Sequence, residues 1–184
     1  MISGDRLPTI ETTRLRLRWL TESDVPALYE VFSDAQVMQY WSSAPLRDLT
    51  EAGALLREIH AHFAAGTLHQ WGIARRSDDR VIGTCTLAAI VRDHKRAEIG
   101  FALGSAFWGE GYAREAVGAL LRHAFETFGL HRIEADVDPA NESSIRCLEH
   151  FGFRREGHAR ERWHMNGRIC DSLLYGLLRR EYRR

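Results

Sequence analysis

The chain has 184 residues, which is enough for one domain with a full hydrophobic core, and we expect a single domain spanning residues 1–184. Its 25 basic and 25 acidic side chains give a formal net charge of +0, which excludes the strongly basic field of a DNA-binding or membrane-surface protein. The three cysteines form no CxxC pair, and neither an apolar leader nor a membrane-length apolar run is present. These features predict a cytoplasmic protein.

The first third of the chain predicts one strand followed by two helices. Leucines alternate with arginines over residues 13–20, the period of a strand with one buried face. Cap residues and an apolar stripe predict a helix directly after it, and a second helix runs from Asp48 or Thr50 to Gly66. The loop between them, 36–46, holds large apolar groups and either lines a pocket or packs over the core.

The middle of the chain predicts an antiparallel meander. Residues 69–75 and 81–91 are strand-like segments joined by a polar turn at 77–80. Residues 94–103 predict a third consecutive strand, because apolar side chains occupy every second position.

A turn crowded with small residues links this strand to a long amphipathic helix that ends near Gly129. Gly109 and Gly111 let the backbone approach a ligand closely, and the helix start offers unpaired N–H groups and the positive end of its dipole. The combination predicts a phosphate site. Arg114 stands where a Rossmann motif has its third glycine, and the P-loop sequence Gly-Lys-Ser/Thr is absent, so both common nucleotide motifs fail.

Two side chains near this turn have two readings each. Arg114 is a cation in the first helical turn, which opposes the dipole by roughly 0.3–1 kcal/mol. It therefore indicates either a nearby anion or an arginine that reaches solvent. Trp108, directly before the glycines, is either a lid or part of the core.

The last third predicts a strand at 131–137, a helix capped by residues 138–141, and two antiparallel strands at 160–165 and 168–178. Asn166-Gly167 joins the last two strands and is a strong hairpin signal, because both turn residues need positive φ. The order β-αα-βββ-α-β-α-ββ predicts an α/β (α+β) fold. Its sheet is mixed, mostly antiparallel and of about seven strands, with helices on its faces.

Three motifs together resemble a known family. Trp108-Gly109-Glu110-Gly111-Tyr112-Ala113 resembles the acetyl-CoA pyrophosphate loop of the GCN5-related N-acetyltransferases (GNAT), with Trp108 replacing the usual Gln or Arg. The opening Glu11-Thr12-Thr13-Arg14-Leu15-Arg16-Leu17-Arg18, and Asn141-Glu142-Ser143-Ser144 before Phe151-Gly152-Phe153, are similar to the branch that contains the ribosomal-protein N-terminal acetyltransferases. The resemblance spans nearly the whole chain.

The resemblance implies direct transfer of acetyl from acetyl-CoA to a primary amine in a ternary complex. The strand end would hold the acetyl and pantetheine portion, and the glycine turn the pyrophosphate. The implied cofactor-binding residues are Phe101, Ala102, Leu103, Trp108, Gly109, Glu110, Gly111, Tyr112, Ala113, Arg114, Asn141 and Ser144.

Some of these positions have a second interpretation, and others depart from the family pattern. Asn141 matches a pantetheine-contacting position and is equally well explained as a helix N-cap. Ser144 matches a position near the departing thiolate, or is an ordinary helix-start serine. Leu148 stands where many relatives carry a tyrosine that protonates the thiolate, so Ser144 or water would substitute. Glu110, a carboxylate between the glycines, must point away from the phosphates.

The implied reaction also needs a base. Glu98 projects from the strand on the face opposite Ile99 and Phe101 and is the candidate base or water-relay base, with a solvated carboxylate as the alternative. An α-amine has a pKa of about 7.7–8.0, and a lysine side chain has a pKa of about 10.4. Roughly a tenth of an α-amine is therefore uncharged at neutral pH, whereas the uncharged fraction of lysine is far smaller. Without an obvious strong acid–base pair, a protein or peptide N-terminus is the favoured acceptor.

Other readings stay open. The alternatives are an acetyltransferase for a small amine, such as an amino acid, polyamine or antibiotic, and a non-catalytic acyl-CoA-binding sensor. The nine histidines lack metal-ligand spacing, so no metal is expected. The sequence does not distinguish an interface from core, so a homodimer is compatible with it.

Overall fold

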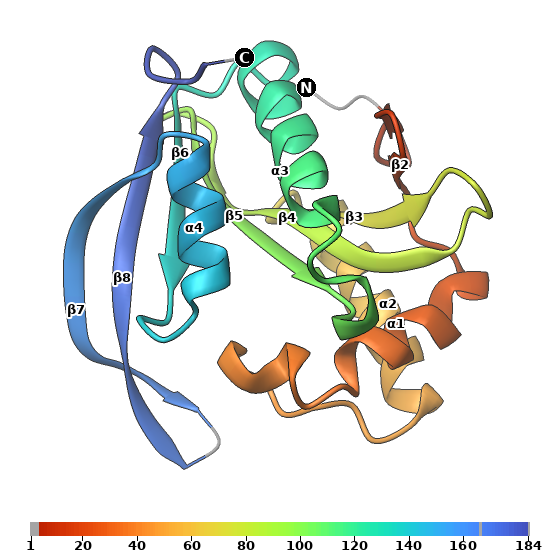
Figure 1. Ribbon diagram of the computed structural model, residues 1–184. Coiled ribbons are helices and arrows are strands. Elements are labelled where there is room, and N and C mark those ends of the chain that lie inside the picture. The colour runs from red at the N-terminus through yellow and green to blue at the C-terminus, as the bar shows by residue number, and fades with distance from the viewer. Residues whose placement is uncertain (1–3, 166, 184) are drawn as a thin grey trace.

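The computed structural model describes residues 4–165 and 167–183, which form an eight-stranded mixed sheet with helices on both faces (Figure 1). The strands are β1 (Ile10–Glu11), β2 (Leu15–Arg18), β3 (Leu68–Arg75), β4 (Val81–Val91), β5 (Arg96–Leu103), β6 (Arg132–Val137), β7 (Arg154–Met165) and β8 (Arg168–Leu178). The helices are α1 (Val25–Phe32), α2 (Leu49–Ala64), α3 (Tyr112–Arg122) and α4 (Glu142–His150), with 3-10 turns at Glu22–Asp24, Val37–Tyr40 and Ser105–Phe107.

The strand order in the sheet is β1-β2-β3-β4-β5-β6-β8-β7. Neighbouring strands are antiparallel except β5 and β6, which are parallel because α3 crosses over between them. The predicted order of elements is confirmed, with β1 as an additional two-residue strand ahead of it. The parallel pairing covers only Arg96–Glu98, at the end of β5 away from the glycine turn that follows Leu103.

The two faces of the sheet carry separate apolar clusters. Helices α3 and α4 cover one face, and α1 and α2 cover the other (Figure 1). Alternation along β5 divides its side chains between them. Ile99 and Leu103 lie in the cluster beneath α3, and Ala102 lies in the cluster with α1 and α2. Glu98 therefore lies on the face opposite Ile99, as the alternation predicts.

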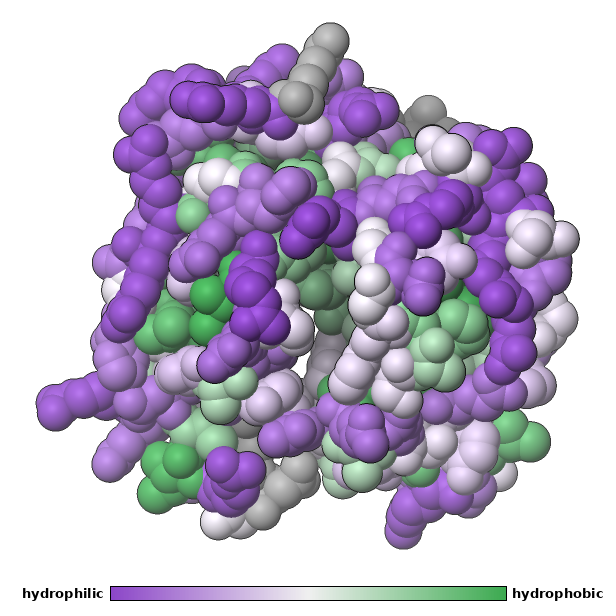
Figure 2. Space-filling model, in the orientation of Figure 1, coloured by the Kyte–Doolittle hydropathy of each residue, from purple (hydrophilic) through white to green (hydrophobic). Residues whose placement is uncertain are grey.

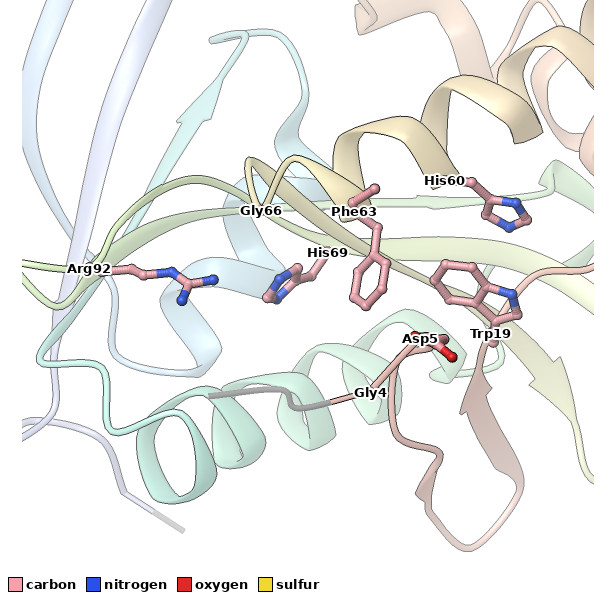
Figure 3. A pocket seen from close by; sticks show the side chains of 9 residues that line it. Gly4, Asp5, Trp19, His60, Phe63, Gly66, His69 and Arg92 are labelled. Atoms are coloured by element: carbon pink, nitrogen blue, oxygen red, sulfur yellow. The ribbon is translucent and has the colours of Figure 1, made fainter.

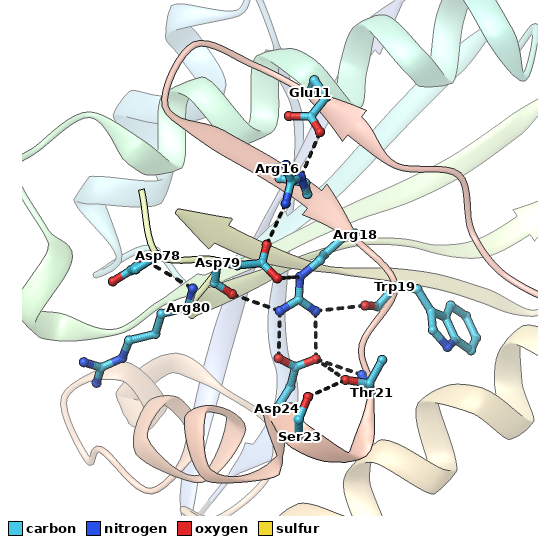
Figure 4. A network of polar contacts seen from close by, with 10 residues as sticks. All are labelled: Glu11, Arg16, Arg18, Trp19, Thr21, Ser23, Asp24, Asp78, Asp79 and Arg80. Carbon is cyan, nitrogen blue, oxygen red and sulfur yellow. Dashed lines mark hydrogen bonds and ion pairs between the residues drawn. The ribbon is translucent and has the colours of Figure 1, made fainter. Parts of the chain in front are cut away.

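An ion pair between the partly buried Arg18 and the buried Asp24 fastens β2 to the start of α1 (Figure 4). The Arg18 guanidinium donates to both carboxylate oxygens of Asp24 at 2.8 and 2.9 Å. Burial works against ionisation of Asp24, but hydrogen bonds from Arg18 and Thr21 outweigh it and hold its pKa below the usual value. Arg18 also donates to the Asp79 carbonyl at 3.0 Å, so the same side chain holds the β3–β4 turn.

Two segments differ from the prediction. The helix expected to continue to residue 128 ends at Arg122 and is followed by a π-helical turn, His123–Thr127. Strand β7 begins at Arg154 rather than at residue 160, with register shifts between Arg155 and Gly157 and between Ala159 and Trp163.

The closing hairpin is confirmed by the pairing of Met165 with Arg168, although Asn166 itself lies outside the described residues. The 36–46 loop largely packs over the core, since Val37 and Met38 are buried against α1 and α2. None of the helices in the described ranges has the length and apolar character needed to cross a bilayer.

Candidate functional site

Strands β5 and β6 pair only at their N-terminal ends and then separate. Arg96–Glu98 pairs with 132–134, and no pairing follows, whereas β5 stays paired with β4 as far as Leu103. In Figure 2 the surface is hollowed between α4 on one side and the turn after β5 on the other. This opening between the separated ends of β5 and β6 is the gap, and the edge of β5 that faces the gap has no strand partner.

Alternation of the ladder shows which backbone groups face the gap. The Gly104 N–H donates to the Ile82 carbonyl at 2.9 Å, so residues two apart from Gly104 also direct their backbone groups toward β4. Ala102, which pairs with Thr84, belongs to that set. The N–H and C=O groups of Phe101 and Leu103 are directed toward the gap instead.

The turn after β5 is held to the strand by Trp108. Its indole N–H donates to the Leu103 carbonyl at 2.7 Å, while about half of the side chain remains exposed. Trp108 is thus neither an isolated lid nor core. It anchors the turn through the strand carbonyl that faces the gap.

Gly109 and Gly111 are required by backbone conformation, because their φ angles are 82° and 79°. A Cβ at Gly109 would meet nothing within 4 Å, so conformation rather than crowding explains the glycine. Gly111 is the N-cap of α3, and Tyr112 is its first residue. The first N–H groups of α3 are therefore presented at the turn.

Arg14, at the end of the β1–β2 turn, braces this glycine turn. Its guanidinium donates to the Glu110 carbonyl at 2.9 Å and to the Glu115 carboxylate at 2.7 Å, and it lies 4.5 Å from the centre of the Tyr112 ring. The Thr12 hydroxyl also donates to Glu115, at 2.7 Å. The pKa of Glu115 is lowered because these hydrogen bonds outweigh its burial.

A groove of about 440 Å³ runs along α3 from this turn. Gly111, Arg114, Gly118 and Arg122 line it at helical spacing, with His150 from the end of α4. Neither arginine has a hydrogen-bond or ion-pair partner among the described residues. The groove accordingly presents two unpaired cations on the same face of α3 as the glycine turn.

Helix α4 begins at the other side of the gap. The Asn141 side-chain oxygen accepts hydrogen bonds from the Ser144 N–H at 3.1 Å and the Ser143 hydroxyl at 3.0 Å, so the N-cap interpretation is confirmed. Its amide NH₂ is not used in this cap. The Ser144 hydroxyl forms no hydrogen bond within the described residues. Leu148 is 1% exposed and packs in the core beneath α3 and α4.

Glu98 is half-buried on the opposite face of the sheet. Burial raises its pKa, the charge of Asp136 raises it further, and Arg162 opposes both effects. Among the described residues Glu98 has no hydrogen bond or ion pair. No hydrogen bond joins it to Ser144 either, since Glu98 lies on the sheet face that α1 and α2 cover and α4, which carries Ser144, lies on the other face.

The other carboxylates on this face of β6 are paired with arginines. Glu134 accepts from Arg96 at 2.7 Å and from Arg132 at 2.8 Å. Asp136 accepts from Arg162 of β7 at 2.7 Å. Glu98 is thereby the carboxyl group of this set that remains unpaired.

The gap is crossed by one further contact. The Tyr40 hydroxyl, from the loop between α1 and α2, donates to the Ala140 carbonyl at 3.1 Å, directly before α4. This contact joins the half of the molecule that carries β5 to the half that carries β6 and α4.

A strand that separates from its parallel neighbour, continues into left-handed glycines and ends at an open helix start is suited to an extended cosubstrate with phosphate groups. The fold and this geometry define an α/β protein with a candidate site for such a cosubstrate along the gap. Among the described residues no group of three or more His, Cys, Asp or Glu side chains is placed to hold a metal ion.

Comparison with known proteins identifies the family. The model of the acetyltransferase (GNAT) domain matches residues 14–154. The N-acetyltransferase p20 of Bacillus licheniformis is 36% identical over 176 residues, which covers 96% of this chain and 99% of that protein. The ribosomal protein uS5-alanine N-acetyltransferase of Escherichia coli is 26% identical over 175 residues, covering 91% and 89%.

A solved structure of spermidine N-acetyltransferase from Vibrio cholerae, in complex with CoA and spermine, superimposes with a TM-score of 0.82 at 25% identity, covering 93% of this chain and 99% of that one. The chain belongs to the GNAT acetyltransferases, and it is an acetyl-CoA-dependent N-acetyltransferase.

Several features of the site were not among the sequence predictions. Arg122 was detectable, because it repeats the position of Arg114 two helical turns later. The contacts of Arg14, Tyr40 and Arg162 join residues that are 26 to 101 positions apart. No local pattern in the sequence indicates which partner each would meet.

Proposed function

We propose that this enzyme acetylates the N-terminal α-amine of a protein or peptide. Acetyl-CoA enters the gap between β5 and β6, with its pyrophosphate at the α3 start and the rest of its nucleotide portion along the α3 groove. The unpaired Arg114 and Arg122 support this orientation, since each supplies a cation where a phosphate group would lie.

The thioester is held at the end of β5. The Phe101 N–H is directed into the gap by the register of the ladder and donates to the developing oxyanion. The Asn141 amide NH₂, which the N-cap leaves unused, donates to the pantetheine arm. Both assignments use groups without a partner in the described protein.

Proton transfer is divided between the two faces of the sheet. Glu98 accepts the proton that the ammonium must lose, directly or through water, and the neutral nitrogen then attacks the thioester carbon. As the carbon–sulfur bond breaks, the Ser144 hydroxyl or water donates a proton to the thiolate, and the second proton of the attacking nitrogen, which is lost as the amide forms, replaces it. The raised pKa of Glu98 makes its carboxylate a stronger base, and an α-amine, whose pKa is lower than that of lysine, gives up its proton to such a base more readily than lysine does.

The arginine pairing of the neighbouring carboxylates carries the choice of acceptor. A polyamine brings several positive charges and needs several unpaired carboxylates. Here Glu134 and Asp136 are occupied by arginines, which leaves Glu98 alone. One unpaired carboxyl group fits an acceptor with a single ammonium, as at a peptide N-terminus.

A polyamine is the second candidate acceptor. The relative of known structure from Vibrio cholerae is named for spermidine and was solved with spermine. Opening of the Asp136–Arg162 ion pair would free a second carboxylate for such a substrate.

Release of free thiol from acetyl-CoA separates these acceptors. The panel contains a peptide with a free N-terminus, the same peptide with a blocked N-terminus and an internal lysine, and spermidine. We expect kcat/KM for the free peptide to exceed that of the other two by about tenfold or more. A higher value for spermidine would overturn the acceptor assignment.

Two substitutions test the proton-transfer roles. Glu98→Gln and Ser144→Ala should each lower kcat while leaving acetyl-CoA affinity largely unchanged, by about tenfold to a hundredfold for Glu98→Gln. Glu58→Gln in α2 and Ser77→Ala in the turn between β3 and β4, both at exposed positions, are the matched controls. Full turnover of both test variants across the pH range would refute the roles.

A further inference from the structure

A second cavity lies away from the gap and from the α3 groove, with which it shares no lining residue. It has a volume of about 430 Å³, within the range of small-molecule sites. The end of β2, the second half of α2, the start of β3 and the β4–β5 turn surround it (Figure 3). Nothing in the acetyl-transfer chemistry uses these elements.

One end of the cavity carries two nitrogen donors without acceptors. Arg92, on the exposed β4–β5 turn, has no hydrogen-bond or ion-pair partner among the described residues. His69 is 8% exposed and also forms no hydrogen bond there, and its Nδ1 atom is fully buried. Figure 3 shows the guanidinium beside the imidazole.

Arg92 favours an anion at this end, and His69 can add an uncharged N–H donor. Burial lowers the pKa of His69 to about 4, and the charge of Arg92 lowers it in the same direction, so the ring is neutral at neutral pH. A neutral imidazole offers one N–H, and a guanidinium offers a planar pair of N–H groups that matches a carboxylate.

The other end of the cavity is aromatic. The Trp19 and His60 rings are stacked with centroids 4.4 Å apart and planes 9° apart, and the Phe63 ring meets Trp19 edge-on at 5.0 Å. His60 is itself held by a 3.0 Å hydrogen bond between Nε2 and the Leu20 carbonyl. These rings present a fixed apolar wall to a flat ligand.

We propose that this cavity binds a small aromatic monocarboxylate, with the carboxylate on Arg92 and His69 and the ring against Phe63 and Trp19. The Asp5 carboxylate also lines the cavity and has no partner among the described residues. It disfavours a second negative charge on the ligand, which argues for a monocarboxylate over a phosphate ester.

Calorimetric titration with phenylacetate tests the site on the whole protein, without acetyl-CoA. We expect one saturable site with a Kd of about 1 mM or tighter. Phenylacetamide, which has the same shape without the charge, should bind about tenfold more weakly or worse. This comparison uses the unmodified protein, so it does not depend on the folding of any variant.

Arg92→Gln should weaken phenylacetate binding by about tenfold or more. Arg57→Gln, at an exposed arginine of α2 that lines neither cavity, should leave it unchanged. Saturating CoA should not displace phenylacetate, which keeps this result separate from the proposed acetyl-CoA site. The inference fails if no saturation occurs by about 10 mM, if the amide binds equally well, if Arg92→Gln has no effect, or if CoA competes.

Discussion

The buried His69 makes the stability of this protein depend on pH in a defined window. Its pKa falls from 6.5 to about 4 on folding, mainly through burial and then through the charges of Arg92 and His123. Because the folded pKa lies below the unfolded one, the contribution of the neutral ring is fully present above pH 6.5 and is lost as the pH falls toward about 4.

The magnitude follows from linkage. One pH unit of displacement corresponds to about 1.4 kcal/mol, so the complete effect is about 3 kcal/mol. At about pH 5.5 the loss is about 1.4 kcal/mol, and at about pH 4.5 it is about 2.6 kcal/mol. These are large fractions of the stability of an ordinary domain.

This loss of stability on acidification can be measured directly by urea unfolding of wild type and His69→Phe at three pH values, near pH 7, about pH 5.5 and about pH 4.5. Phenylalanine retains an aromatic ring among Phe63 and Phe128, whose ring centres lie 5.6 Å from that of His69, and removes the titration. The free energy of unfolding of the variant should fall less on acidification, by about 2 to 3 kcal/mol at the lowest pH.

His94→Phe, at an exposed histidine of the β4–β5 turn, is the matched control and should follow wild type. The carboxylates that titrate at low pH are common to all three proteins, so the comparison cancels them. Parallel pH profiles for wild type and His69→Phe would refute the reasoning.

Three further predictions concern the glycine turn and the Arg18–Asp24 ion pair. Gly111→Ala places a Cβ on a residue with a φ of 79°, and urea unfolding should show a free energy of unfolding lower by about 1–2 kcal/mol. The same variant should have a higher KM for acetyl-CoA, and an unchanged KM would contradict this prediction. Arg14→Gln should raise KM for acetyl-CoA by about threefold to tenfold with kcat nearly constant, whereas a loss confined to kcat would not fit its place at the turn. Arg18→Ala leaves the buried Asp24 without its cationic partner and should lower the free energy of unfolding by about 3 kcal/mol or more. The double variant Arg18→Met with Asp24→Leu removes both charges and should lose less stability. Equal losses for the two variants would argue against an uncompensated charge.

The elements with strong local patterns were predictable from the sequence. The alternation over residues 13–20 and the meander 69–103 both correspond to strands with one or both faces buried. The closing hairpin followed from turn chemistry, and the glycine turn from its need for positive φ. In each case the signal lies within a few neighbouring residues.

The first half of β7 could not be predicted in this way. Residues 154–161 are polar on both faces, because β7 is the edge strand and only β8 pairs with it. Its two register shifts also break any period of two. The π-helical turn after Arg122 was missed for a related reason, since the apolar spacing continues through it unchanged.

The candidate site likewise contains residues that local sequence patterns place correctly and residues whose positions depend on how distant elements pack. The sequence placed Glu98 on the correct face and Asn141 at a helix start, both from local periodicity and cap chemistry. It could not place Leu148 in the core, nor pair Asp136 with Arg162, since these depend on how α4 and β7 pack on the sheet. The proposed choice of acceptor rests on such pairings, which is why residue types alone left the acceptor open.

The opening motif and the glycine turn, which the sequence presents as separate signals, form one unit in the structure. Glu115 lies in the first turn of α3, where its charge would oppose a phosphate group at the helix start. Arg14 and Thr12 bind that carboxylate, and Arg14 also holds the Glu110 carbonyl. The Arg14–Glu115 ion pair reduces the repulsion between Glu115 and a phosphate group, and Arg14 also fixes the turn. A phosphate site at α3 therefore depends on a turn about a hundred residues earlier, and a change to either segment should impair acetyl-CoA binding in the same way.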